Sequence, residues 1–153
     1  HTRSQLVEAA ALLIYTAPPA PGVLQAAMEG VRPQRVYLAA IPPAAQTLNA
    51  FLTRLLGLCK YTISHREGQV DLDALAGAAA QTAEAVYWGL RVLVAKGAIC
   101  MEERGEDIQV APPGTCPSTN DEQEAEATLR ALLAEAAAYR TFFGRAPADT
   151  LLT

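Results

Sequence analysis

Two short apolar runs near the beginning of the chain predict a pair of strands. Residues 11–16 (ALLIYT) and 35–41 (RVYLAAI) are each followed closely by two consecutive prolines. A continuous apolar run bounded in this way is typical of a strand buried on both faces. The residues between them predict a helix from Pro21 to Gly30, because proline suits the first helical turn and glycine suits its end. Two strands joined by a helix favour parallel pairing, so residues 1–43 are expected to form a β-α-β unit.

Residues 44–113 follow the element order of a winged helix, with three helices and then a hairpin. The helices are indicated by leucines at helical spacing, by the N-cap candidates Asp71 and Thr82 and by the stop Lys96-Gly97. A polar turn around Gly105 separates two short apolar strands, which form the predicted wing. The expected elements are a helix over 45–59, a linker over 60–69, helices that begin at Asp71 and Thr82, and strands over 99–101 and 108–110.

Residues 114–153 predict a proline-rich crossing followed by one long helix. Asn120 and Gln123 resemble a capping box, and the acidic residues after Asn120 suit the positive end of a helix dipole. An apolar stripe extends to Phe143, after which Gly144 and Pro147 end the helix. The fold class is therefore mixed α/β (α+β). Because the chain does not begin with Met, we expect one compact accessory domain excised from a larger protein.

The helix over 82–96 occupies the position of a recognition helix and has little with which to read DNA. The face opposite its core stripe is apolar and includes Trp88, and it is flanked only by Arg91 and Lys96. It offers no Asn or Gln for adenine and one Arg at most for guanine. Since a helix that is apolar all round is normally buried, we expect this one to pack against the rest of a larger protein or against a partner.

Net charge, cysteine spacing and the longest uncharged stretch argue against several classes of protein. The net charge is −4, no segment is a basic arm, and a nucleic-acid site would therefore need a local patch. Cys59, Cys100 and Cys116 are widely spaced without a C-x-x-C pair, which argues against a disulfide framework and structural zinc and fits a reducing cytoplasm. The longest uncharged stretch, 36–53, contains prolines and polar residues, which argues against a transmembrane helix.

Candidate catalytic groups are few. The histidines are His1 and His65, too few for a metal hydrolase site. Cys59 lies six residues before His65, but a free cysteine is more often a small buried hydrophobe than a nucleophile. The chain has no G-x-S-x-G, P-loop or EF-hand motif. We therefore expect no catalytic residue, metal or cofactor in this fragment.

Basic and aromatic residues of the linker and its neighbours are the remaining candidates for a binding site. They could hold a single-stranded phosphate run with base stacking, or an acidic peptide with an apolar end, or they could be ordinary solubilising charge. The candidate residues are Lys60, Tyr61, His65, Arg66, Trp88, Arg91, Lys96 and Arg104.

The succession of elements resembles the C-terminal region of bacterial RecJ-type exonucleases, which are specific for single-stranded DNA. The resemblance covers most of the chain and concerns its plan more than exact motifs. It departs from the family where Gly114-Thr115-Cys116-Pro117 replaces a hydroxyl-and-tyrosine element before the last helix. The matching segments are Leu12–Tyr15 before Pro18-Pro19, Arg35–Leu38, Phe51-Leu52-x-x-Leu55, Val70–Ala76, Val86 to Ile99, Ala111-Pro112-Pro113, and Glu124 to Phe143.

The resemblance implies a role in DNA repair and recombination. The parent protein would be a hydrolase that degrades single strands from the 5′ end with Mn²⁺ or Mg²⁺, and its catalytic motifs match nothing in this chain. The chain would be a non-catalytic interaction domain that contacts the nuclease core and recruits single-stranded DNA-binding protein or a helicase. The alternatives are a direct single-stranded-DNA-binding module and a winged-helix regulator that binds duplex DNA.

Overall fold

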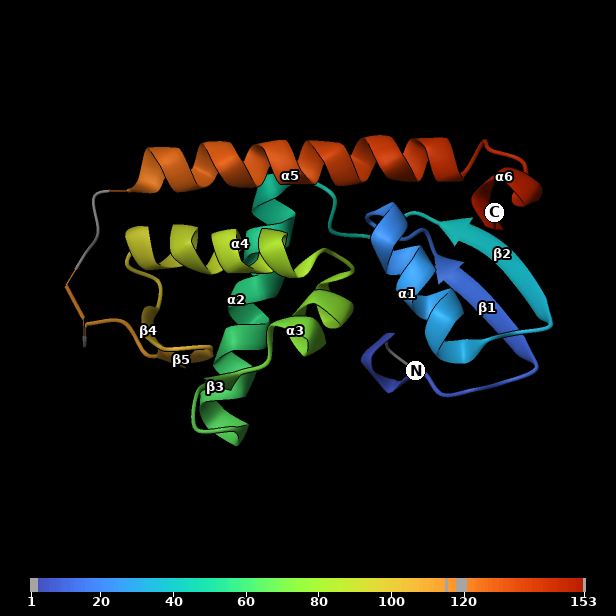
Figure 1. Cartoon of the computed structure of the whole chain (residues 1–153). Helices are drawn as coiled ribbons and strands as arrows, with labels where there is room; N and C mark the ends of the chain where they lie inside the picture. Colours follow the sequence, from blue (N-terminus) through green and yellow to red (C-terminus); the bar gives the residue numbers. More distant parts are fainter. Residues whose placement is uncertain (1–2, 115, 118–120, 153) are drawn as a thin grey trace.

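The computed structural model describes residues 3–114, 116–117 and 121–152 and is a mixed α/β protein, as the sequence predicts. Strands β1 and β2 form a parallel sheet, and β3, β5 and β4 form an antiparallel sheet in that order (Figure 1). The elements are a 3₁₀ turn η1 at Arg3–Gln5, strands β1 (Ala11–Thr16), β2 (Arg35–Ile41), β3 (Gln69–Val70), β4 (Cys100–Arg104) and β5 (Asp107–Ala111), and helices α1 (Pro21–Val31), α2 (Leu48–His65), α3 (Leu72–Ala79), α4 (Ala83–Ala95), α5 (Glu122–Phe143) and α6 (Ala148–Leu152).

The predicted β-α-β connection is confirmed, with parallel pairing from Ala11 opposite Arg35 to Ile14 opposite Leu38. Helix α1 passes Gly30 by one residue and ends on Arg32, whose φ of 49° is left-handed and whose N–H donates to the Met28 carbonyl. The glycine is therefore not the helix stop. The backbone itself closes the last turn by an αL cap.

The expectation that both strands are buried on both faces is wrong. Exposure alternates along β1 and β2, so that one face packs towards α1 and the other is open. On the inner face, Ile14 and Leu38 pack against a small cluster around Leu24 and Phe143. On the open face lie Leu13, Tyr15 and Tyr37, which are 61%, 60% and 53% exposed. Ile41 lies beyond a shift in strand register, opposite Thr16, and is 41% exposed.

Helix α2 is longer than the sequence pattern indicated. Thr47 caps its first turn by accepting the Ala50 N–H at 3.2 Å, and the helix continues to His65, through most of the expected linker. Residues 60–63 contain no Gly or Pro to stop it. The chain turns only at Glu67 and Gly68, both with positive φ. At Gly68 a Cβ would lie 2.0 Å from the Val110 carbonyl oxygen, so glycine permits this close approach.

The two helices after this turn begin where the sequence predicts. Asp71 accepts the Ala74 N–H at 3.0 Å, and Thr82 accepts the Ala85 N–H at 3.1 Å, so both are side-chain N-caps. The predicted hairpin is also confirmed, with antiparallel pairing of β4 and β5 around Gly105. The two-residue strand β3, which pairs with β5, was not predicted.

Helix α5 connects the two parts of the molecule. Its first half packs along α4, and its last residues reach the β-α-β unit (Figure 1). Asp121 is the N-cap without a side-chain cap hydrogen bond, and the predicted capping residue Asn120 lies outside the described residues. The short helix α6 after Pro147 was not predicted.

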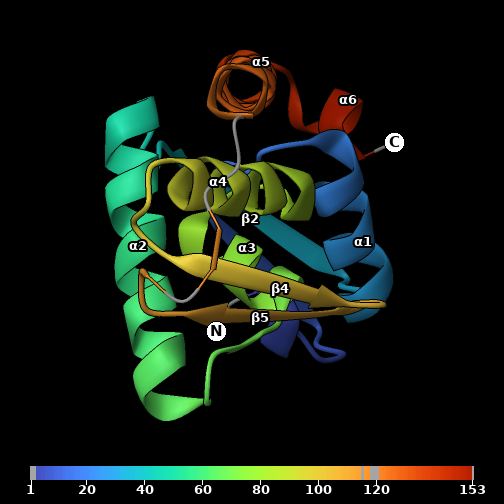
Figure 2. The ribbon, with the colours of Figure 1, turned by 90° about the vertical axis from the view of Figure 1, so that its left-hand side faces the viewer.

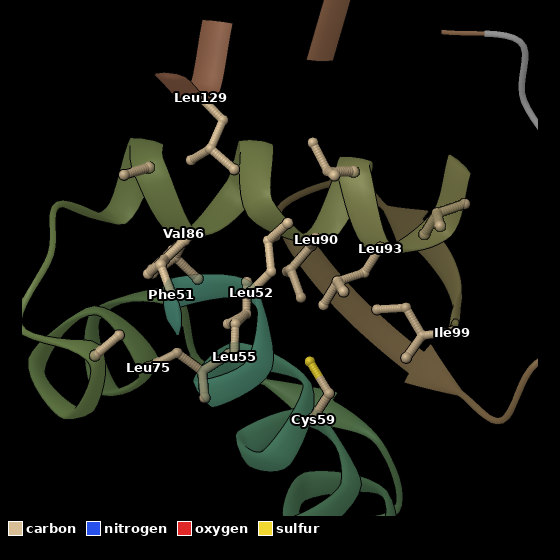
Figure 3. Packing of buried hydrophobic residues seen from close by; sticks show 14 of the residues in the cluster. Phe51, Leu52, Leu55, Cys59, Leu75, Val86, Leu90, Leu93, Ile99 and Leu129 are labelled. Carbon is tan, nitrogen blue, oxygen red and sulfur yellow. The ribbon is translucent and has the colours of Figure 1, made fainter. Parts of the chain in front are cut away.

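Most of the core lies between α2, α3, α4 and α5. Phe51, Leu55, Leu90 and Leu129 have no exposed surface and pack together across three of these helices (Figure 3). Gly89 permits the close contact of α4 with α2, since a Cβ there would lie 2.6 Å from Leu55 Cδ2. A view along α5 shows α4 between α5 on one side and α3 with the hairpin on the other (Figure 2).

Cys100 and Cys116 form a disulfide, although their spacing argued against a disulfide framework. The Cys100–Cys116 bond joins Cα atoms 5.7 Å apart and fastens the crossing before α5 to the first residue of β4. The physical reason is the hairpin: Cys100 lies opposite Ala111, and the chain that leaves β5 therefore passes close to Cys100. Cys59 is the free, buried cysteine among the described residues.

Candidate binding site

The eight predicted site residues do not form one patch. Tyr61, His65 and Arg66 lie at the end of α2, where the Tyr61 and His65 rings stack with centroids 4.3 Å apart. Arg66 and Arg104 line one hollow of about 190 Å³, together with Glu67 and Asp107. Lys60 is exposed on the last turns of α2.

The other three predicted residues lie on or directly after α4, towards α5. Arg91 lies 6.0 Å from the centre of the Trp88 ring, and its Nη2 is 3.3 Å from Asp121 Oδ2. Lys96 Nζ contacts Glu122 Oε1 at 3.0 Å and Glu126 Oε2 at 3.4 Å. Their positive charge is therefore offset by the first turns of α5 within the same chain.

The pKa values of these groups follow from the same contacts. The hydrogen bond to Glu122 and the charge of that carboxylate raise the pKa of Lys96. The hydrogen bond from Arg130, and then that from Lys96, lower the pKa of the Glu126 carboxyl. The hydrogen bond with the Tyr87 hydroxyl is the main cause that raises the pKa of Arg91. These groups stay charged and paired at neutral pH, which leaves them little capacity for a phosphate backbone.

The cover of α4 also differs from the expectation. Of the residues expected on its outer face, Ala85, Gly89 and Val92 are buried, and Gly89 in fact lies against Phe51 and Leu55 of α2. The element that packs along this helix is α5 of the same chain, whereas the sequence suggested the rest of a larger protein or a partner. Helix α5 therefore covers part of the surface that a recognition helix would insert into a major groove.

Cys59 and His65 do not make a catalytic pair. Cys59 is fully buried, and burial raises the pKa of its thiol to about 11, which suppresses the reactive thiolate. His65 is exposed, and its Nδ1 lies 3.1 Å from the Tyr61 carbonyl oxygen. Among the described residues there is no group of three or more His, Cys, Asp or Glu side chains placed to hold a metal ion.

The sequence analysis missed the open face of the β1–β2 sheet. Its exposed residues Leu13, Tyr15 and Tyr37 belong to the apolar runs, so the pattern carried no polar alternation to mark this face as exposed. The signal that could have indicated it is architectural: one helix between two strands can cover one face of a parallel sheet, and no later segment resembles a second layer.

A groove of about 340 Å³ follows the free edge of β1. One wall is β1 from Leu12 to Thr16, the floor includes Val23 and Ala27 of α1, and the opposite side is formed by Arg3, Leu6, Gly77 and Ala80. The lining is mostly apolar, and the sequence analysis connected β1 with α1 but not with Gly77 and Ala80.

Comparisons with protein-family models, with curated proteins and with solved structures find no match. No helix in the described part of the chain combines the length and apolar character needed to cross a membrane. The function is therefore argued from the surfaces described above.

Proposed function

We propose that this chain is a non-catalytic protein-interaction domain whose docking surface is the open face of the β1–β2 sheet. The observation that carries the proposal is the exposure of Leu13, Tyr15 and Tyr37 on one face of the sheet. Parallel sheets are normally covered on both faces, and contiguous exposed apolar side chains mark interaction sites. A protein partner supplies the second apolar layer that this sheet lacks.

The direct single-stranded-DNA alternative has less support. Arg91, Lys96 and Arg104 contact carboxylates of Asp121, Glu122 and Glu102. Lys60 and Arg66 remain at the end of α2 as candidate phosphate contacts. A site for single-stranded DNA usually combines a positively charged groove along the phosphate backbone with aromatic residues that stack on bases. Two cations beside the stacked Tyr61–His65 pair provide little of such a groove.

We further propose that residues 48–111 are a winged-helix module that serves as a scaffold. The support is the element order α2, β3, α3, α4, β4, β5 together with the sheet order β3-β5-β4. The duplex-DNA alternative has the least support, because α5 covers α4 and the hairpin carries Glu102, Glu103, Glu106 and Asp107.

The resemblance to RecJ-type exonucleases gives this domain a proposed context. It would contact the nuclease core of the same protein and recruit single-stranded DNA-binding protein or a helicase, while Mn²⁺ or Mg²⁺ serves the catalytic domains elsewhere in that protein. The proposed cytoplasmic location conflicts with the Cys100–Cys116 bond, because structural disulfides are rare in reducing compartments. A thiol count on protein purified under native conditions resolves that conflict.

The test is a fluorescence-anisotropy titration at low salt with three labelled probes and two matched variants. The probes are the acidic tail peptide of single-stranded DNA-binding protein, a single-stranded oligonucleotide and a duplex. Tyr37→Ser alters the open face, and Tyr61→Ser is its control, because the two tyrosines are 53% and 57% exposed. We expect the peptide to bind and Tyr37→Ser to weaken it roughly tenfold, as a truncated interface anchor does, while Tyr61→Ser has no effect.

Two results would contradict the proposal. Oligonucleotide binding that falls steeply with salt and is lost in Tyr61→Ser would establish the DNA alternative. Peptide binding that is equal in wild type and Tyr37→Ser would remove the open face as the docking surface.

A further inference from the structure

The groove beside β1 lies along an unpaired strand edge. Within the described chain β1 pairs with β2 alone, so its other edge has no strand beside it. Alternate residues of such an edge direct their N–H and C=O groups away from the existing partner, which is the template for another strand. The groove of about 340 Å³ follows this edge from Leu12 to Thr16. Its shape and its hydrogen-bonding groups therefore suit an extended polypeptide.

The side chains that line the groove indicate which side chains a bound segment should have. Val23, Leu24 and Ala27 of α1 form an apolar floor that suits apolar side chains at every second position of an added strand. Arg3 is the single charged residue among the described lining residues, and no carboxylate lines the groove. Asp73 and Arg3 both line a neighbouring hollow of about 500 Å³. Burial lowers the pKa of Arg3, and the negative charge of Asp73 partly offsets this effect.

A second positive charge lies behind the end of the groove. Arg140 of α5 is buried, and its Nε donates to the carbonyl of Ala17, which lines the groove. Its other described contact is also a carbonyl, that of Ala80. A cation bonded to neutral carbonyls is not compensated by them, so the field at this end of β1 favours an anion.

A second copy of this chain is a poorer occupant. The edge of β1 is recessed between α1 and the wall formed by Arg3, Leu6 and the end of α3. A second copy would bring its own α1 and η1 against these walls. Docking through the open face would use on the order of 400 Å², about half of the roughly 800 Å² that each partner buries in a stable dimer.

We propose that the free edge of β1 accepts an extended segment of a partner protein as a third strand, with apolar residues at alternate positions and a carboxylate beside Arg3. This is β-augmentation, in which main-chain hydrogen bonds give affinity and side-chain pockets give specificity. The inference rests on the proposed function, because it specifies how a protein partner engages the same sheet.

The experiment selects the ligand rather than assuming it. A library of random dodecapeptides displayed on phage is panned against the whole chain, and selected peptides are synthesised for calorimetry. We expect selected sequences to alternate apolar residues with Asp or Glu. Ala27→Phe fills the groove from α1 and should reduce affinity at least about tenfold, as loss of an anchoring pocket does. Ala26→Phe is the matched control, since Ala26 lines the neighbouring hollow and not this groove.

Main-chain and charge readouts complete the test. Bound peptide should slow amide hydrogen exchange at alternate residues of β1, because their N–H groups become donors to a new strand. Arg3→Glu should weaken acidic peptides roughly tenfold and be rescued by peptides with Lys in place of the acid. Failure to enrich any peptide, or binding unaffected by Ala27→Phe, overturns strand addition. Binding that Tyr37→Ser abolishes without protection of β1 amides also overturns it, yet leaves the proposed docking function standing.

Discussion

The two halves of this molecule differ in how completely they bury their apolar side chains. The region from α2 to β5, together with the first half of α5, encloses a core in which Phe51, Leu55, Leu90 and Leu129 have no exposed surface. The β1-α1-β2 unit has a small cluster of Ala17, Leu24 and Phe143 and leaves one face of its sheet open. One of the three residues of that cluster comes from α5. Helix α5 contributes to both clusters, but the first half buries most of its large apolar side chains, whereas the second leaves one face of its sheet open.

Helix α5 is the element that makes the two halves one body. At its first end, the Cys100–Cys116 bond and the contacts of Arg91 and Lys96 with acidic residues hold it over α4. At its other end, Phe143 and Arg140 contact the β-α-β unit. Stability should therefore be concentrated in the first half, and the capacity to bind should be concentrated in the second.

The largest expected effect comes from emptying the enclosed core. Phe51→Ala should lower the free energy of unfolding by about 3–5 kcal/mol, because a fully buried aromatic ring leaves a cavity. Leu13→Ala, on the open face, is the control and should cost well under about 1 kcal/mol. Urea denaturation followed by circular dichroism measures both. Equal losses of unfolding free energy would show that side chains of the two halves contribute equally to stability.

Breaking the disulfide tests how the first end of α5 is held. Cys116→Ser should cost about 3 kcal/mol, the chain-entropy value for closing a loop of roughly this length, with 16 residues separating the cysteines. Wild-type protein in dithiothreitol should fall to the same stability, and the variant should not respond to reductant. Three reactive thiols in denatured, unreduced wild type would show that the bond does not form in solution.

The parts of this fold that follow from local pattern could be predicted, and those that depend on packing between distant segments could not. Asp71 and Thr82 cap helices because their side chains act within three residues. The strand limits at 11–16 and 35–41 follow from apolar runs. Helix α2 extends to His65, past the predicted end at Cys59, because residues 60–63 contain no Gly or Pro that would stop it.

The candidate site was harder to predict for the same reason. The sequence gives no partner for Arg91 and Lys96. In the fold, α5 packs along α4 and brings Asp121 and Glu122 into contact with them. The Cys100–Cys116 pair depends on the hairpin bringing two segments together. The groove beside β1 is lined by residues from the range 3–27 and by Gly77 and Ala80, which lie far from them in the chain. The spacing of residues within one segment does not predict contacts between segments that are distant in the chain.

Arg140 tests the junction between the halves. Arg140→Met keeps much of the length of the side chain but leaves the carbonyls of Ala17 and Ala80 without this donor, which should cost about 1–3 kcal/mol. Burial lowers the pKa of Arg140, as expected for a cation held away from water. Hydrogen exchange should accelerate in β1 and β2 and remain slow in α2 and α4. Arg130→Met, on an exposed part of α5, is the control and should change neither rate.

The smallest expected effect on stability belongs to the open face. Tyr37→Ser should change the free energy of unfolding by no more than about 0.5 kcal/mol, because the side chain is more than half exposed and has little packing to lose. The same substitution is expected to weaken partner binding roughly tenfold. A residue whose loss weakens binding and leaves folding unchanged contributes to an interface and not to the core. If Tyr37→Ser instead destabilised the chain by more than about 2 kcal/mol, the face would be a structural element of this domain, and the contrast between its two halves would disappear.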